Sequence, residues 1–285
     1  MNRFKLSYLA VVVALCDGAV PAKPAPNPFF ALCMDTHDAR KRSLAEQAQL
    51  LKELGYDGAG HVGLDNLQQR IQTLDAVGLR LFHVYVWLNL KPDAPQPYDP
   101  RLRQLLPQLQ GRNVLLGVLV TGGKPSDEAL DPRAVALLRE LAQLSVPFGV
   151  NIGLYPHTGD WLQRVEDALR VAQKVDHPNV GVIFNLCHWL RTDPQRNYRP
   201  LLEAAGRRLF GVTINGADEF DPQPGWSRYI QPLDSGSFDV SRLLKTLRQL
   251  GYSGPIGLQC YGLGGDAREH LSRSMAAWRK LNSTP

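Results

Sequence analysis

The sequence predicts an α/β protein, a single-domain parallel (β/α)8 TIM barrel that spans residues 29–285. Two observations support this fold class. Short apolar runs rich in β-branched residues alternate with segments of helical periodicity, and eight segments of each kind fill almost the whole chain. The length agrees, because barrels of this kind typically take about 250 residues.

The pattern also indicates where the individual elements begin and end. At the first predicted helix, Ser43 and Glu46 form a capping-box pattern, and Gly55 ends the apolar periodicity. The alternation leaves almost no sequence for a second domain. The predicted strands cover residues 29–35, 58–62, 80–87, 114–120, 150–155, 180–185, 210–215 and 255–260.

The N-terminus has the features of an export signal. A basic start precedes an apolar run from Leu6 to Leu15 and then small and Pro-rich residues, which predicts a signal peptide over residues 1–22 and a Pro-rich lead-in over 23–28. The apolar run is too short to cross a bilayer, and no other run is long enough. We therefore expect a secreted or periplasmic protein without a transmembrane segment, with a lipid anchor on Cys16 as the alternative.

Charge and cysteine content exclude further classes of function. The formal net charge is +5, and charges of both signs are scattered along the helical segments. This indicates a solvated surface rather than a basic stripe, so we expect no nucleic-acid partner. Cys33, Cys187 and Cys260 lie inside apolar runs and are interpreted as buried small hydrophobic residues. Cys187 lies close to His188, which leaves a catalytic thiol as an alternative.

Polar and aromatic residues gather where the predicted strands end. The C-terminal ends of parallel barrel strands converge on one mouth, so we expect these side chains to face a common ligand. The long segment 219–237 contains Trp226 and predicts a lid or substrate wall. His83, inside an apolar strand, is interpreted as a satisfied buried residue. The candidate residues are His61, Trp87, Tyr155, His157, Asn185, His188, Asn215, Asp218, Trp226 and Gln259.

Four of these strand ends resemble a known family. They read GVNIGLYPH at 149–157, VGVIFNLCH at 180–188, FGVTINGAD at 210–218 and PIGLQ at 255–259. The pattern is similar to strands five to eight of the xylose isomerase-like barrel superfamily. That superfamily holds sugar isomerases, ketose 3-epimerases, inosose dehydratases, 3-keto-glycoside lyases and endonuclease IV.

The resemblance implies a divalent metal site, but the chain departs from it. The four positions that match the metal ligands of the family are Tyr155, Asn185, Asn215 and Gln259, and none of them carries a negative charge or an imidazole. A hard divalent cation prefers ionised carboxylates and histidine. We therefore expect no metal and no other cofactor. A weaker, displaced site at the histidines, with His61 or Asp35, is the alternative.

The surviving residue types suit a carbohydrate. Amides and the Tyr155 phenol can bond sugar hydroxyls, Trp87 and Trp226 can cover an apolar sugar face, and His157 and His188 can move a proton next to a carbonyl. The sequence predicts an exported enzyme that acts on a free sugar or keto-sugar by isomerisation, epimerisation or elimination. The alternatives are core packing of the amides, and a catalytically silent sugar-binding protein.

Overall fold

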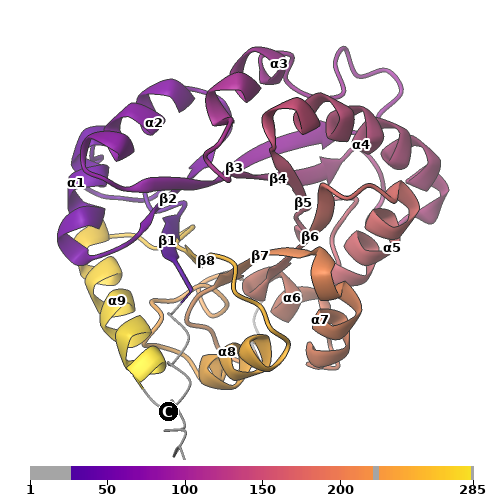
Figure 1. Cartoon of the computed structure of the whole chain (residues 1–285). Coiled ribbons are helices and arrows are strands. Elements are labelled where there is room, and N and C mark those ends of the chain that lie inside the picture. Colours follow the sequence, from indigo (N-terminus) through magenta and orange to yellow (C-terminus); the bar gives the residue numbers. More distant parts are fainter. Residues whose placement is uncertain (1–26, 221–224, 284–285) are drawn as a thin grey trace, which may run out of the picture.

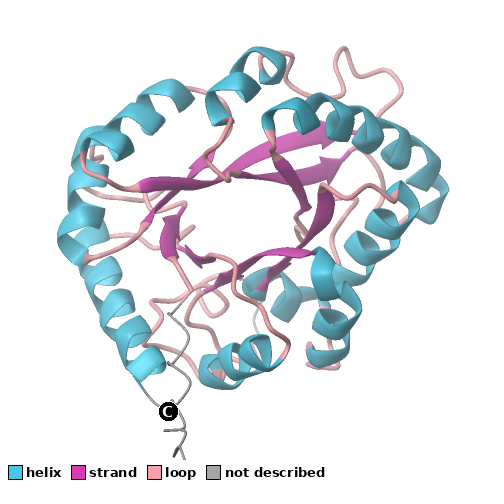
Figure 2. Ribbon diagram, in the orientation of Figure 1, coloured by secondary structure: helices cyan, strands magenta, loops and turns pink. Residues whose placement is uncertain are grey.

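Parallel strands close into one barrel. The computed structural model describes residues 27–220 and 225–283, and in this part of the chain eight strands pair in sequence order, with β1 returning to pair with β8. Figure 1 shows the helices as a ring around the strands, and Figure 2 shows the same two layers coloured by secondary structure. The predicted (β/α)8 barrel is confirmed.

Each predicted strand corresponds to an observed one. β1 ends earlier than expected, because Cys33 adopts a left-handed backbone with φ of 58° that breaks the extended conformation. β3 runs further than expected and stays paired with β4 up to Asn89 and Thr121. The strands are β1 (Phe29–Leu32), β2 (Gly58–Val62), β3 (Arg80–Asn89), β4 (Leu115–Thr121), β5 (Asn151–Leu154), β6 (Val180–Asn185), β7 (Leu209–Ile214) and β8 (Ile256–Gln259).

The helices follow the predicted alternation with one correction. Two helices, α6 and α7, lie between β6 and β7 where one was expected, because Pro194 holds the preceding Asp193 in an extended conformation. The capping box of Ser43 and Glu46 at the start of α1 is confirmed. The helices are α1 (Leu44–Leu54), α2 (Leu67–Ala76), α3 (Leu102–Leu105), α4 (Asp131–Ser145), α5 (Val165–Val175), α6 (Leu186–Thr192), α7 (Arg199–Ala205), α8 (Val240–Gln249) and α9 (Ala267–Ser283).

Apolar side chains form one layer inside the barrel and another between strands and helices. Along β6, Ile183 belongs to the inner cluster and Phe184 to the outer one, as the period of two predicts. The interior is narrow, and glycines make room for large neighbours. A Cβ added at Gly153 would lie 2.6 Å from the Ile183 side chain. Large and small inward residues on neighbouring strands thus fill the barrel together.

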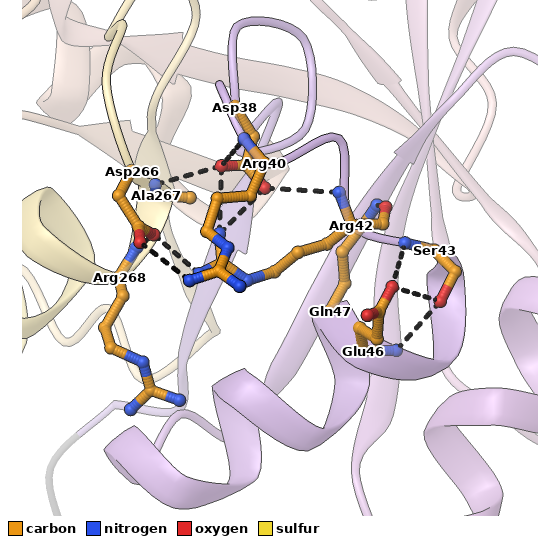
Figure 3. Close-up of polar contacts among 9 residues, drawn as sticks. All are labelled: Asp38, Arg40, Arg42, Ser43, Glu46, Gln47, Asp266, Ala267 and Arg268. Atoms are coloured by element: carbon orange, nitrogen blue, oxygen red, sulfur yellow. Dashed lines mark hydrogen bonds and ion pairs between the residues drawn. The ribbon is translucent and has the colours of Figure 1, made fainter.

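A buried polar cluster ties the loop after β1 to the start of α9 at the mouth of the barrel (Figure 3). The carboxylate of Asp38 accepts hydrogen bonds from the Ala267 amide at 3.2 Å and the Arg42 guanidinium at 2.9 Å. The same guanidinium bonds Asp266 at 2.6 Å. The Asp38 side chain is only 1% exposed. We call this cluster the Asp38–Arg42–Asp266 tether.

The predicted signal peptide, residues 1–22, and residues 23–26 of the lead-in lie outside the described residues. Within the described part of the chain, no helix is both long and apolar enough to cross a bilayer.

We predict that Asp38→Asn lowers the free energy of unfolding by about 1–3 kcal/mol, because it weakens charge-assisted hydrogen bonds to a buried guanidinium. Burial alone would raise the pKa of Asp38, but the Ala267 amide and the Arg42 guanidinium hold it below its ordinary value. The stabilisation is therefore present at neutral pH and lost as the pH falls through the lowered pKa. Denaturant unfolding at neutral and acidic pH should show the difference from the wild type shrinking with acidification.

Asp75→Asn is the matched control, because Asp75 pairs with Arg112 at the surface, where ion pairs contribute about 0–1 kcal/mol. Equal losses in the two variants would contradict the special role of the tether.

Candidate functional site

A cavity of about 290 Å³ opens at the C-terminal ends of the strands. Aromatic rings and two imidazoles dominate its lining, and no Asp or Glu is among the described residues that form it. The cavity is therefore uncharged when the imidazoles are neutral. Its lining residues are Cys33, Thr36, Val62, Tyr85, Trp87, Leu119, Tyr155, His157, Thr158, His188, Trp226, Ile230, Gln259 and Tyr261.

A larger hollow, of about 660 Å³, lies at the opposite end of the barrel, where Asn113, Asn151 and Pro255 precede or begin their strands. In such barrels the active site lies at the C-terminal end of the strands, because the loops that carry reactive side chains converge there. The smaller cavity also holds both candidate histidines, so we take it as the candidate active site.

The floor of the cavity is a hydrogen-bond network centred on the hydroxyl of Tyr155. The Asn185 amide donates to this hydroxyl, and the Gln259 amide donates to it at 3.2 Å and to the Tyr85 hydroxyl at 3.4 Å. The amide oxygens are engaged as well: that of Gln259 accepts from the Tyr261 backbone at 3.1 Å, and that of Asn185 accepts from the Cys187 thiol at 3.2 Å. Three of the four positions matched to metal ligands are thus linked by hydrogen bonds, with Tyr155 between Asn185 and Gln259.

This donor set does not fit a divalent cation. Burial raises the pKa of Tyr155 well above its ordinary value, so the phenol is neutral at pH 7. The amide hydrogens of Asn185 and Gln259 point at the phenol oxygen, where a cation would repel them. In the described part of the chain, no three His, Cys, Asp or Glu side chains cluster as metal ligands would.

His157 and His188 lie in contact at one side of the cavity. Their ring centroids are 4.2 Å apart, and the Trp226 ring packs against His188 in a T-shaped arrangement with the ring centroids 4.9 Å apart. The backbone amide of Thr158 donates to Nδ1 of His188 at 3.0 Å. Burial, and then the neighbouring His157, hold the pKa of His188 well below its ordinary value, so this imidazole is neutral at pH 7.

Aromatic side chains form the walls of the cavity. Trp87 and Tyr261 are 45% and 51% exposed, which leaves their ring faces open to a ligand. Trp226 and Ile230 come from the loop after β7, so this loop forms part of the cavity wall, as the sequence predicts. Arg191 holds this loop: it donates to the Gly225 carbonyl at 2.7 Å, and its guanidinium lies 5.3 Å from the Trp226 ring centre.

His61 was expected to face the ligand, but the structure places it elsewhere. Val62 faces the cavity, so the alternation along β2 turns His61 to the outer side of the barrel. There Nδ1 accepts from Arg70 at 3.4 Å, and Nε2 contacts the Asp65 carbonyl at 2.8 Å. Arg70 also pairs with Asp35 at 3.6 Å. Both proposed partners of a displaced metal site are therefore engaged with Arg70.

Asn185 is not among the residues that line the cavity, and it reaches the site only through its bond to Tyr155. Asn215 and Asp218 do not line the cavity either, and both organise the loop after β7. The Asn215 amide donates to the Tyr229 carbonyl at 2.6 Å, and the side chain is fully buried. Asp218 pairs with Arg228 at 2.5 Å and accepts from the Ser237 backbone at 3.1 Å. These residues shape the wall that carries Trp226.

Cys33, Cys187 and Cys260, the cysteines in the described part of the chain, are buried and free, as predicted. Burial raises the pKa of Cys187 to about 12 and that of Cys33 well above its ordinary value. Neither thiol forms a thiolate at neutral pH, which argues against the catalytic-thiol alternative.

Four further residues take part in the site. Tyr85 and Tyr261 line the cavity, and both were visible in the sequence as aromatic residues at strand ends. Thr158 and Asp160 lie in the loop after β5 and contact His188 and His157. No pattern in the sequence marks these two, because the contacts depend on how the loop turns.

Comparison with known proteins identifies the family of the chain and relatives of part of it. The family model of the xylose isomerase-like TIM barrel matches residues 48–281. The inosose isomerase of Bacillus subtilis is 24% identical over 151 residues, which cover 50% of this chain and 51% of that protein. The 3-dehydroshikimate dehydratase of Pseudomonas aeruginosa is 26% identical over 168 residues, or 58% of this chain and 26% of that protein. The chain thus spans about half the length of the first of these relatives and about a quarter of the second.

Solved structures share the fold. The IolI protein with a bound zinc atom superposes with a TM-score of 0.71 at 16% identity, covering 90% of this chain and 98% of that one. The 3-keto-D-glucoside 4-epimerase of E. coli gives a TM-score of 0.70 at 16% identity, covering 89% of this chain and 99% of that one. At these identities the likeness establishes the barrel and not the chemistry.

We predict that Tyr155→Phe lowers the free energy of unfolding by about 1–3 kcal/mol, because it leaves the buried Asn185 amide without its acceptor and the Gln259 amide with only the longer bond to Tyr85. Tyr85→Phe is the control: its hydroxyl receives only the longer bond, so the loss should be smaller. Thermal or denaturant unfolding of both variants measures this, and a larger loss in Tyr85→Phe would show that the network is centred elsewhere.

Proposed function

Since the chain belongs to the xylose isomerase-like TIM barrel family, we propose that it is an enzyme that moves protons on a free sugar or keto-sugar. The reaction is an isomerisation, epimerisation or elimination. The observation that carries this proposal is the contact between His157 and His188 inside one aromatic cavity. Imidazole titrates nearest to neutral pH, which suits it to proton transfer beside a carbonyl.

Several features support a carbohydrate as the substrate. Relatives are named inosose isomerase and 3-keto-D-glucoside 4-epimerase. The exposed rings of Trp87 and Tyr261 can cover the apolar face of a sugar ring, as Trp226 can from the opposite loop. The phenols of Tyr85 and Tyr155 offer hydrogen bonds to sugar hydroxyls at the floor.

The proposed chemistry uses no divalent metal. Removing a proton beside a carbonyl places negative charge on the carbonyl oxygen, which must be stabilised by hydrogen-bond donors in the cavity. The floor and His188 offer neutral donors, and amides rather than carboxylates surround Tyr155. This supports chemistry in which hydrogen bonds from protein side chains, rather than a cation, stabilise the negative charge on the carbonyl oxygen.

A catalytically silent sugar-binding protein remains the second candidate. The observation that favours it is the engagement of Asn185 and Gln259 with Tyr155, because these amides are occupied by the protein and not free for a substrate. Both candidates use the same cavity and differ only in turnover. We further propose that residues 1–22 direct export, with the sugar met outside the cytoplasm.

We predict that a thermal-shift screen of free, amino and 3-keto sugars finds a ligand that the wild-type protein also converts. His157→Gln and His188→Gln should each lower kcat by about 100-fold or more while changing binding less, because a proton carrier acts mainly in the transition state. His177→Gln, a histidine remote from the cavity, is the control. Turnover should persist after dialysis against EDTA, with far less than one metal ion per chain by elemental analysis.

Two outcomes would contradict the proposal. A stoichiometric zinc, manganese or magnesium ion whose removal abolishes turnover would overturn the metal-free chemistry. A sugar that binds but is never converted, with equal loss of affinity in both histidine variants, would identify a sugar-binding protein.

We also predict that the native protein lacks residues 1–22. Mass spectrometry of protein recovered from its natural host should give the processed N-terminus. An intact Met1, or a lipid on Cys16, would contradict soluble export.

A further inference from the structure

The two histidines of the cavity have different partners at Nδ1. His188 accepts the backbone N–H of Thr158 at 3.0 Å. A backbone N–H can only donate, so Nδ1 of His188 must present its lone pair and cannot carry a proton. The Thr158 hydroxyl also lies 3.0 Å from this nitrogen and can donate to it as well.

This contact fixes the tautomer of His188. With the lone pair on Nδ1, the proton of the neutral ring is on Nε2. His188 is buried, with 5% of its surface exposed, and lines the cavity. Among the described residues Nε2 has no hydrogen-bond partner, so the N–H is free to donate to a ligand.

His157 has the opposite arrangement. Its Nδ1 lies 3.1 Å from a carboxylate oxygen of Asp160, although the two groups are not aligned as a hydrogen bond. A carboxylate can only accept, so it favours a proton on Nδ1 of His157. Nδ1 is buried while the side chain is 38% exposed, so the exposed surface lies on the rest of the ring, and His157 lines the cavity.

One turn of the chain creates both contacts. After β5, the His157 amide donates to the Leu162 carbonyl and the Asp160 amide donates to the His157 carbonyl, each at 3.0 Å. Gly159 completes the turn with φ of 90°, a conformation that glycine adopts without strain. This turn places the Thr158 N–H against His188 and the Asp160 carboxylate against His157.

We infer that Thr158 and Asp160 are positioning residues that set opposite tautomers in the histidine pair, so that His188 presents an N–H and His157 a lone pair to the ligand. An adjacent donor and acceptor complement the carbonyl oxygen and the neighbouring H–C–OH of an α-hydroxycarbonyl compound. The ligand class is therefore a sugar in its keto or aldehyde form. The inference rests on the proposed function for its chemistry and on these contacts for its geometry.

The proton inventory of the proposed step balances. Nε2 of His157 takes the proton from the carbon beside the carbonyl, and the C–H electron pair forms the carbon–carbon double bond of an enediolate. The carbonyl electron pair moves to oxygen, which accepts a hydrogen bond from the N–H of His188. The protonated His157 then delivers its proton to the former carbonyl carbon, and the proton of the neighbouring hydroxyl passes to the former carbonyl oxygen, which gives the isomerised sugar. No oxidant, reductant or metal is consumed.

The test is ¹⁵N NMR of the histidine side chains in the whole purified protein without a ligand, with resonances assigned through His157→Gln and His188→Gln. We expect His188 with its proton on Nε2, a scalar coupling across the Thr158 N–H to Nδ1 of His188, and His157 with its proton on Nδ1. A proton on Nδ1 of His188, or the same tautomer in both rings, would overturn the inference.

Variants separate positioning from folding, with thermal unfolding as the check on the native state. Asp160→Ala should shift His157 toward the Nε2–H tautomer and leave His188 unchanged; if it fails to fold, Asp160→Asn should shift it in part. Thr158→Val keeps the backbone N–H, so His188 should keep its tautomer. A changed His188 tautomer in Thr158→Val, or an unchanged His157 in Asp160→Ala, would refute the assignment. These readouts need no substrate, so they decide the inference independently of whether any sugar is turned over.

Discussion

Closure of the strands β1 to β8 into one barrel is the constraint on which both fold and site depend. A closed barrel has one narrow interior, so each inward side chain must share space with those of its neighbours. Large residues such as Leu115 and Ile183 therefore face glycines such as Gly153 and Gly211. The same closure brings the last inward residue of several strands to one rim, where Tyr155 and its neighbours meet.

Electrostatics sets the second constraint, because the floor of the cavity is buried. A charged side chain there would need a partner of opposite charge, because the surroundings have a low dielectric constant. The chain instead has neutral side chains at this place, one phenol and two amides. The amide hydrogens of Asn185 and Gln259 bond the Tyr155 hydroxyl, and their oxygens bond Cys187 and Tyr261, so these polar groups are paired within the protein. The histidine pair is the proposed reactive group, and its two imidazoles differ in their partners.

The sequence predicts the part of this arrangement that local pattern controls. The alternation of strands with helices predicts the barrel, and the period of two along a strand predicts the inward phase of Asn185 and Gln259. The placement of His61 depends on the phase of a short Gly-rich strand, and its partner Arg70 comes from a helix. Asn215 faces inward but is covered by a loop that returns fourteen residues later, at Tyr229. The role of Asp160 depends on a turn that has no sequence signature.

The Asp38–Arg42–Asp266 tether has a consequence for how the chain folds as it is synthesised. Asp38 and Ala267 are 229 residues apart, so the Asp38 carboxylate leaves the ribosome long before the amide that it accepts. β1 likewise lacks one of its two pairing partners until β8 has emerged. The mouth of the barrel, including Gln259 at its floor, therefore assembles only after β8 and the start of α9 have emerged. Until then Asp38 and Arg42 lack the Ala267 amide and the Asp266 carboxylate that complete the tether.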